Sequence, residues 1–140
     1  MARLYLDACM IIDLVEGDAE RQQSLKTALR GQDVISSELA RLESRIGALR
    51  HNQTEYLETY RRFFLDCVMV PMDAAVFSLA TDLRVDYAIK TPDALHLAAA
   101  LLGEATELWT NDKRLAAAAK DRIRILTWTD LDGSMTSRRD

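Results

Sequence analysis

The sequence contains few cysteines, prolines and glycines: two, two and five of its 140 residues. Cys9 and Cys67 form neither a Cys-x-x-Cys pair nor the ligand spacing of a zinc site. Both have apolar neighbours, so we expect two small buried side chains in a protein of a reduced compartment. The cysteine pattern therefore argues against a structural zinc domain.

Long apolar runs are also missing. No run approaches the ~20 residues of a membrane-spanning helix, and the N-terminus lacks the basic, apolar and small-residue pattern of a signal peptide. We expect a cytoplasmic protein that does not enter a membrane. Excess positive charge is absent too, because the net charge is −4 and the pI about 5.2. This charge argues against a protein held on nucleic acid by bulk charge alone, although bound cations would offset acids locally.

Internal repeats, low-complexity tracts and Pro/Gly-rich linkers are not found. The hydrophobic fraction of 49% and the charged fraction of 29% are ordinary for a globular protein, and 140 residues suit one core. We predict one domain over residues 1–132 and a flexible polar tail over residues 133–140.

Short apolar runs alternate with helical patterns along the whole chain. Strands are predicted near residues 4–6, 34–35, 68–70, 108–110 and 123–128. Helices between them favour an α/β fold with a mostly parallel sheet of about five strands, covered on both faces. The segment 91–102 is apolar nearly all round, so we predict a central buried helix. In the helix after Ser37, we expect an inward apolar stripe made of Leu39, Leu42, Ile46 and Leu49.

Four acids lie at the ends of separate apolar segments or beside them. Asp7 and Asp112 directly follow predicted strands, Asp93 opens the apolar helix, and Glu43 lies on an amphipathic one. Strand ends and helix starts share one edge of a parallel sheet, where ligands bind, so these acids could meet. Clustered carboxylates repel one another and require a cation, and hard divalent ions take oxygen ligands. The set favours metal-assisted chemistry on a phosphate ester.

Each acid also has a structural explanation of its own. A carboxylate at a helix N-terminus, as for Asp7, Asp93 and Asp112, contributes about 0.3–2 kcal/mol by capping N–H groups or complementing the helix dipole. Glu43 fits a solvated position on a charged helix face. The catalytic interpretation therefore depends on the whole set.

Four segments of the chain resemble the motifs of PIN-domain ribonucleases, in order and spacing from Asp7 to about Trp128. The Pro-Asp-Ala segment is the most specific match, and the chain has the size of VapC-type toxins. The matching segments are Asp7 after the first strand, Ile35-Ser36-Ser37 followed by Glu43 and Gly47, Thr91 to Ala100 (TPDALHLAAA), and Thr110-Asn111-Asp112.

The resemblance implies a PIN-like three-layer α/β/α sandwich and a metal-dependent endoribonuclease toxin that acts on RNA. It further implies a cognate antitoxin that inhibits the toxin, and a homodimer. Glu38 is an alternative to Glu43 as the acid of the second motif. Asn111, like Thr110, offers a group that could orient a water or a phosphate. The implied ligands of one or two Mg²⁺ or Mn²⁺ ions are Asp7, Asp93, Asp112 and Glu43, and the implied catalytic residues are these four and Thr110.

Two other functions remain open at this stage. The first is a non-catalytic module of the same fold that binds RNA or a protein. The second is a phosphatase or receiver-like domain with Asp7 as nucleophile, although cysteine at position 9 breaks the Asp-x-Asp start of one such class. Near the acids, Lys90, Lys113 and Arg114 could bind RNA phosphates or serve as solvent-exposed charge. For His96 we expect a hydrogen-bonded histidine of the core or its rim.

Overall fold

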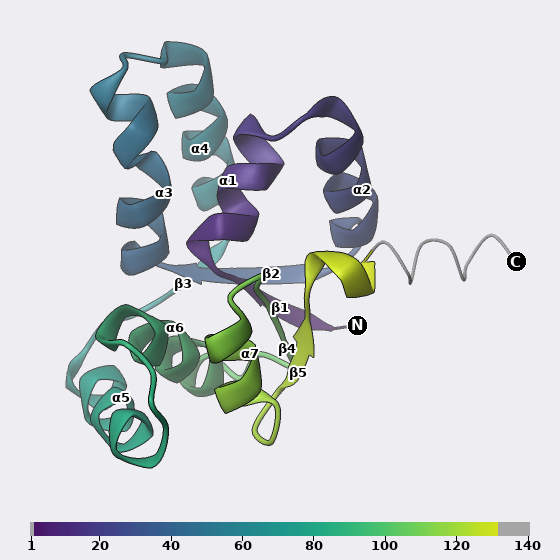
Figure 1. Ribbon diagram of the computed structural model, residues 1–140. Coiled ribbons are helices and arrows are strands. Elements are labelled where there is room, and N and C mark those ends of the chain that lie inside the picture. The colour runs from purple at the N-terminus through teal and green to yellow at the C-terminus, as the bar shows by residue number, and fades with distance from the viewer. Residues whose placement is uncertain (1, 132–140) are drawn as a thin grey trace, which may run out of the picture.

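The protein is described here by a computed structural model, which covers residues 2–131 (Figure 1). A five-stranded sheet runs through it in the order β3-β2-β1-β4-β5, and all neighbouring strands are parallel. The predicted parallel sheet is confirmed, whereas the predicted tail over residues 133–140 lies outside the described residues. The strands are β1 (Arg3–Leu6), β2 (Asp33–Ser37), β3 (Val68–Val70), β4 (Glu107–Trp109) and β5 (Arg124–Leu126).

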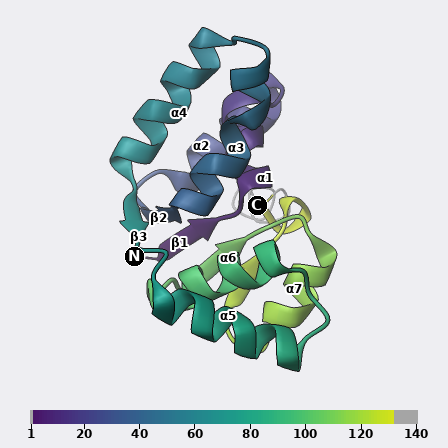
Figure 2. The same cartoon turned by 90° about the vertical axis from the view of Figure 1, so that its left-hand side faces the viewer.

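Helices cover both faces of this sheet, as the two views in Figures 1 and 2 show. One face carries α1 (Ala8–Glu16), α2 (Ala19–Leu29), α3 (Glu38–Arg50) and α4 (Thr54–Asp66). The other carries α5 (Ala74–Asp86), α6 (Thr91–Leu102) and α7 (Lys113–Ala119). This arrangement confirms the predicted three-layer α/β/α sandwich. Among residues 2–131, no helix combines the length and the apolar character needed to cross a bilayer.

The sheet separates two hydrophobic cores. Alternate residues of β1 point to opposite faces, so Leu4 and Leu6 pack with α1 to α4 whereas Tyr5 packs beneath α6. Every residue of α6 from Ala94 to Ala100 is buried, which confirms the predicted central helix. Proline at its first turn has the backbone geometry that a helix start requires.

The orientation predicted for α3 is wrong. Leu42, Ile46 and Leu49 are 56%, 39% and 52% exposed, so most of the predicted inward stripe faces solvent. The buried side of α3 carries small residues instead, Ala40, Ser44 and Ala48. Small side chains let α3 approach α1 and α4, its packing neighbours, more closely than leucines would.

The expectation for the cysteines is wrong at one position. Cys9 is exposed on the first turn of α1, and Cys67 is half-buried after α4.

The strand order creates a switch point between β1 and β4. The chain leaves β1 toward β2 and β3 on one side of the sheet, and returns through α5 and α6 to β4 on the other side of β1. In open α/β sheets, ligands bind at the carboxyl ends of the strands at such a point. Asp7 directly follows β1, and Thr110 directly follows β4.

Candidate active site

Asp7 is a buried carboxylate at the switch point, with only 7% of its surface exposed. Its Oδ1 accepts the backbone N–H of Met10 at 3.0 Å and thereby caps α1. Its Oδ2 accepts the hydroxyl hydrogen of Thr110. Burial raises the pKa of Asp7 above its ordinary value, and the bonds from Thr110 and Met10 oppose that rise.

Thr110 links two of the predicted acids. Its hydroxyl is fully buried, donates to Asp7, and accepts the backbone N–H of Asp112 at 3.0 Å. Asp112 in turn caps α7, because its Oδ1 accepts the N–H groups of Arg114 and Leu115 at 2.9 and 3.0 Å. The side-chain oxygen of Asn111, the residue between Thr110 and Asp112, accepts the backbone N–H of Trp128 at 2.7 Å. That oxygen therefore anchors the segment after β5.

Asp93 lies in the first turn of α6 and is partly buried. Burial raises the pKa of Asp93, and the charges of Asp112, Asp7 and Glu43 raise it further, while His96 lowers it. Electrostatic effects of this kind require proximity. The structure thus brings the four predicted acids from four separate segments into one neighbourhood.

Glu43 reaches this neighbourhood from α3 and contacts His96. Its Oε1 lies 2.5 Å from His96 Nε2, and its side chain is 31% exposed. The alternative acid, Glu38, has a side chain that is 65% exposed and pairs with Arg41 at 3.3 Å on the surface. The geometry therefore favours Glu43 over Glu38 as the fourth acid of the cluster.

A buried hydrogen-bond chain lies behind Glu43, and sequence reasoning found only part of it. His96 Nδ1 lies 2.8 Å from the hydroxyl of Tyr5, which lies 2.7 Å from Ser37 Oγ. His96 is a hydrogen-bonded, buried histidine, as expected. The role of Tyr5 was not predicted; the one available signal was a tyrosine in a buried strand, whose hydroxyl needs a partner.

The donor chemistry of the four acids fits a hard divalent cation. Within residues 2–131, no Lys or Arg forms an ion pair with Asp7, Glu43, Asp93 or Asp112. Their mutual repulsion therefore has no Lys or Arg ion pair to offset it, and all the donors are oxygens.

The four carboxylates are not drawn together into a ready-made cation cage. No group of three or more His, Cys, Asp or Glu side chains in the described part of the chain is arranged to hold one. The hydrogen bonds explain this: Asp7 and Asp112 each accept helix N–H groups, and Glu43 is turned toward His96.

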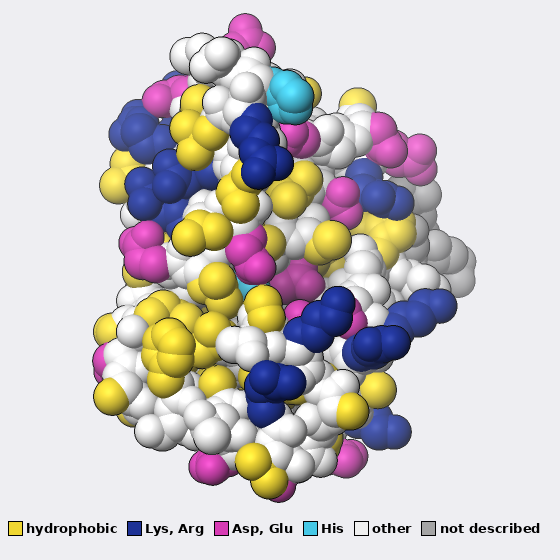
Figure 3. All heavy atoms as spheres, turned by 60° about the vertical axis from the view of Figure 1, so that its left-hand side comes forward, with side chains coloured by type: hydrophobic (Ala, Val, Ile, Leu, Met, Phe, Trp, Pro, Cys, Tyr) yellow, Lys and Arg dark blue, Asp and Glu magenta, His cyan; other side chains and the backbone are white. Residues whose placement is uncertain are grey.

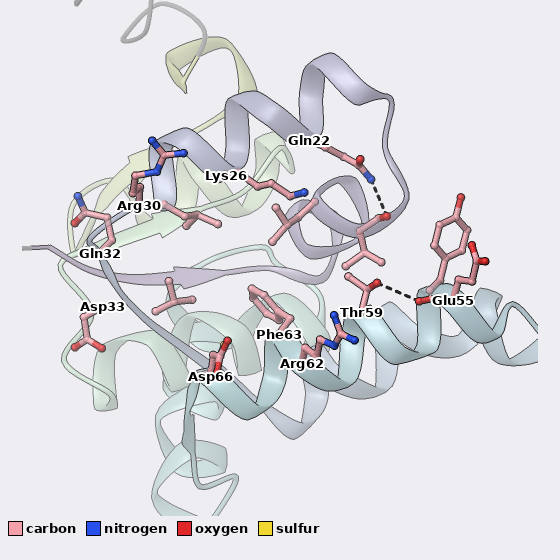
Figure 4. Close-up of a pocket in the computed structure, with 16 residues that line it drawn as sticks. Gln22, Lys26, Arg30, Gln32, Asp33, Glu55, Thr59, Arg62, Phe63 and Asp66 are labelled. Atoms are coloured by element: carbon pink, nitrogen blue, oxygen red, sulfur yellow. Dashed lines mark hydrogen bonds between the residues drawn. The ribbon is translucent and has the colours of Figure 1, made fainter.

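A separate groove of about 810 Å³ lies between α2 and α4 (Figure 4). None of the four acids lines it. Its apolar lining is formed by Leu14, Val15, Leu29, Val34, Tyr56 and Phe63, and charged side chains of both signs at its edges are Lys26, Arg30, Asp33, Glu55, Arg62 and Asp66. Apolar walls with charged edges suit an amphipathic polypeptide.

Comparison with known proteins identifies the family. Among solved structures, a toxin–antitoxin complex from Klebsiella pneumoniae is similar at 23% identity and a TM-score of 0.70, covering 89% of this chain and 96% of that one. FitAcB from Neisseria gonorrhoeae is similar at 18% identity and a TM-score of 0.66, covering 88% and 96%. VapBC-5 from Mycobacterium tuberculosis is similar at 19% identity and a TM-score of 0.61, covering 91% and 98%.

At these identities the structural likeness establishes the fold alone. No curated protein sequence matches the chain. The PIN domain family, however, matches residues 4–121, which include all four acids and Thr110. The chain therefore belongs to the PIN-domain family.

Proposed function

We propose that this protein is a metal-dependent endoribonuclease toxin that hydrolyses RNA phosphodiester bonds and is inhibited by a cognate antitoxin. The observation that carries the proposal is the meeting of Asp7, Glu43, Asp93 and Asp112 at the switch point, with no Lys or Arg among residues 2–131 in an ion pair with any of them. Membership of the PIN-domain family and the fold shared with toxin–antitoxin complexes support it.

Asp7, Asp93, Asp112 and Glu43 would hold Mg²⁺ or Mn²⁺, directly or through water, because these ions prefer oxygen ligands. The bound ion would supply Lewis-acid activation of water and positive charge opposite the phosphoryl oxygens. The chain's own contribution is to orient the ligands. Thr110 fixes one oxygen of Asp7, and the caps on α1 and α7 fix the carboxylates of Asp7 and Asp112 on rigid helix starts.

Basic side chains next to the acids would bind the RNA backbone. Lys90 precedes α6, and Lys113 and Arg114 open α7; all three are exposed. Figure 3 shows acidic side chains near the centre of one face with basic side chains beside them. In a protein of net charge −4, such a local group provides the phosphate contacts that bulk charge does not.

The groove between α2 and α4 is the proposed antitoxin site. Its apolar walls would take the apolar face of an antitoxin segment, and its charged edges would pair with the segment's polar face. The groove is separate from the acids, so an inhibitor bound there would need a further segment to reach them.

The exposed stripe of α3 is the proposed homodimer contact. Leu42, Ile46 and Leu49 recur at helical spacing and are all exposed, and Figure 3 shows further hydrophobic side chains on the same face of the protein. A helix stripe pairs readily with its own copy around a two-fold axis. Light scattering of Leu42→Glu, with Arg50→Glu as a polar surface control on the same helix, tests this contact.

The deciding experiment is incubation of the purified protein with total RNA in Mg²⁺, Mn²⁺ or chelator. Asp7→Asn and Asp93→Asn are the test variants. Asp18→Asn is the matched control, because Asp18 caps α2 through the N–H of Arg21 at 2.8 Å and is not part of the acid cluster. We expect metal-dependent cleavage by wild type and the control only.

Cleavage that persists in chelator or in both test variants refutes the proposal. A protein that neither cleaves RNA nor gains thermal stability from Mn²⁺ would instead match the non-catalytic binding module.

A further inference from the structure

Four side chains from four different elements form one hydrogen-bonded chain that ends at the acid cluster. Ser37 at the end of β2 bonds Tyr5 of β1 at 2.7 Å, and Tyr5 bonds His96 of α6 at 2.8 Å. His96 then bonds Glu43 of α3 at 2.5 Å. The first three are at most 3% exposed, and only Glu43 reaches solvent.

The direction of this chain follows from counting hydrogens. If the Tyr5 hydroxyl donates to His96 Nδ1, the imidazole carries its hydrogen on Nε2 and donates it to the Glu43 carboxylate. Ser37 then donates to Tyr5, while its oxygen accepts the N–H of Ala40 at 3.2 Å. The reverse direction would leave the lone pair of Nε2 facing a carboxylate oxygen. With a neutral histidine and an ionised Glu43, only the first direction pairs every donor of the four side chains with an acceptor.

Hydrogen bonds in this direction restrict the rotamer of Glu43. A partly exposed glutamate on a helix ordinarily samples several rotamers. Here Oε1 is bound by a histidine whose ring is itself held by a buried tyrosine, so the carboxylate is held against α6. Asp93 lies on the same helix, three residues before His96.

We propose that His96 is a positioning residue for Glu43, and that Tyr5, itself bonded by Ser37, holds the His96 ring in place through Nδ1. The claim that this serves the metal site rests on the proposed function. Outer partners that hydrogen-bond a ligating carboxylate orient it, and their loss typically weakens metal affinity by about 10–100-fold.

The first test needs no metal. ¹⁵N NMR of the imidazoles reports which ring nitrogen carries hydrogen, and the exposed His51 serves as an internal reference. We expect the Nε2–H tautomer for His96 in wild type, because Glu43 accepts that hydrogen. In Tyr5→Phe the tautomer should persist, but the Nδ1 resonance should shift because Nδ1 loses the hydrogen bond that it accepts. Tyr60→Phe is the matched control, since Tyr60 is equally buried and its hydroxyl bonds Glu16 in the other core. An Nδ1–H tautomer or a doubly protonated ring in wild type, or an unchanged Nδ1 resonance in Tyr5→Phe, overturns the inference.

The second test measures Mn²⁺ affinity by calorimetry. Tyr5→Phe and His96→Leu should each weaken binding about 10-fold, whereas His96→Gln, which keeps an N–H donor, should restore part of it. In a Glu43→Gln background, Tyr5→Phe should have no further effect, because it acts through Glu43. Additive losses, or unchanged affinity in Tyr5→Phe, overturn the positioning role. A wild type that binds no Mn²⁺ refutes the proposed metal function instead, and the tautomer measurement still decides the hydrogen-bond chain.

Discussion

Thr110→Val isolates the hydroxyl that joins Asp7 to Asp112. Valine has nearly the shape of threonine, so the substitution removes the hydroxyl from a fully buried position and changes little else. It deletes the bond to the Asp7 carboxylate and leaves the N–H of Asp112 without its acceptor.

The magnitude follows from these two bonds. A hydrogen bond to a charged group contributes about 1.5–3 kcal/mol to folding. The bond from the Asp112 N–H is part-buried, so water compensates for part of the second loss. We expect the free energy of unfolding to fall by about 2–3 kcal/mol. Thr110→Ser keeps the hydroxyl and removes one methyl group, which costs about 1 kcal/mol, so it is the matched control.

The effect of Thr110→Val on stability should depend on pH. Burial raises the pKa of Asp7 above its ordinary value of 3.8, so the folded state binds this proton more tightly than the unfolded chain. The contribution of Asp7 to stability is therefore present below that value and is lost as pH rises through the raised, folded pKa. The Thr110 bond favours the ionised carboxylate and limits this loss. The free energy of unfolding of Thr110→Val should therefore be lowered most at neutral pH. In acid it should approach that of Thr110→Ser.

Urea unfolding across a pH series measures both variants. A Thr110→Val protein as stable as Thr110→Ser at neutral pH would refute the assigned hydrogen bond. A stability difference that does not shrink in acid would refute the ionised state of Asp7.

Four further outcomes are expected. Asp93→Asn should abolish RNA cleavage yet keep the wild-type circular dichroism spectrum; wild-type cleavage would make Asp93 structural. At saturating Mg²⁺, the cleavage rate should fall between about pH 8 and about pH 5.5, because the raised pKa values of Asp7 and Asp93 let protons compete with the metal; a flat profile contradicts this. Mn²⁺ at about 100 times its Kd should stabilise wild type by about 2.7 kcal/mol and Asp7→Asn much less, as thermal unfolding would report. Gly103→Ala should destabilise the protein by about 1–3 kcal/mol in urea unfolding, because its Cβ would lie 2.7 Å from Ile35 Cδ1 and Val70 Cγ2; wild-type stability would contradict that close packing.

The sheet and the acid cluster could be predicted because both follow from general geometry. Parallel strands place their carboxyl ends at one edge, so acids after β1 and β4 become neighbours whatever the detailed packing. The burial of α6 was predictable for a similar reason, since a helix that is apolar all round has no polar face that could be exposed to water.

The orientation of α3 could not be predicted, because its periodicity contains two stripes. One consists of large apolar residues such as Leu42 and Ile46, and the other of small ones such as Ala40 and Ala48. Hydrophobicity favours burying the first, whereas close helix packing favours the second. Which effect dominates depends on the distance to α1 and α4, and that distance is a property of the assembled fold.

The hydrogen bonds that link Tyr5, His96 and Glu43 could not be predicted for a related reason. Its members are far apart in the sequence, and they meet only because β1 pairs with β2 beneath α6 in one particular register. A shift of one residue would turn Tyr5 to the other face of the sheet. Residue types alone therefore suggested a partner for His96 without identifying it.

The structural and catalytic interpretations of the acids do not exclude one another. Asp7 uses Oδ1 to cap α1, and Asp112 uses Oδ1 to cap α7, so each carboxylate is anchored to a helix start through one oxygen. The cap stabilises the helix by about 0.5–2 kcal/mol and also holds the charge in place; at Asp7, burial and the charge of Asp112 oppose that charge. Asparagine can make the same cap without the charge. Asp→Asn at these positions should therefore keep or increase stability while removing metal binding, whereas Asp→Ala should reduce both.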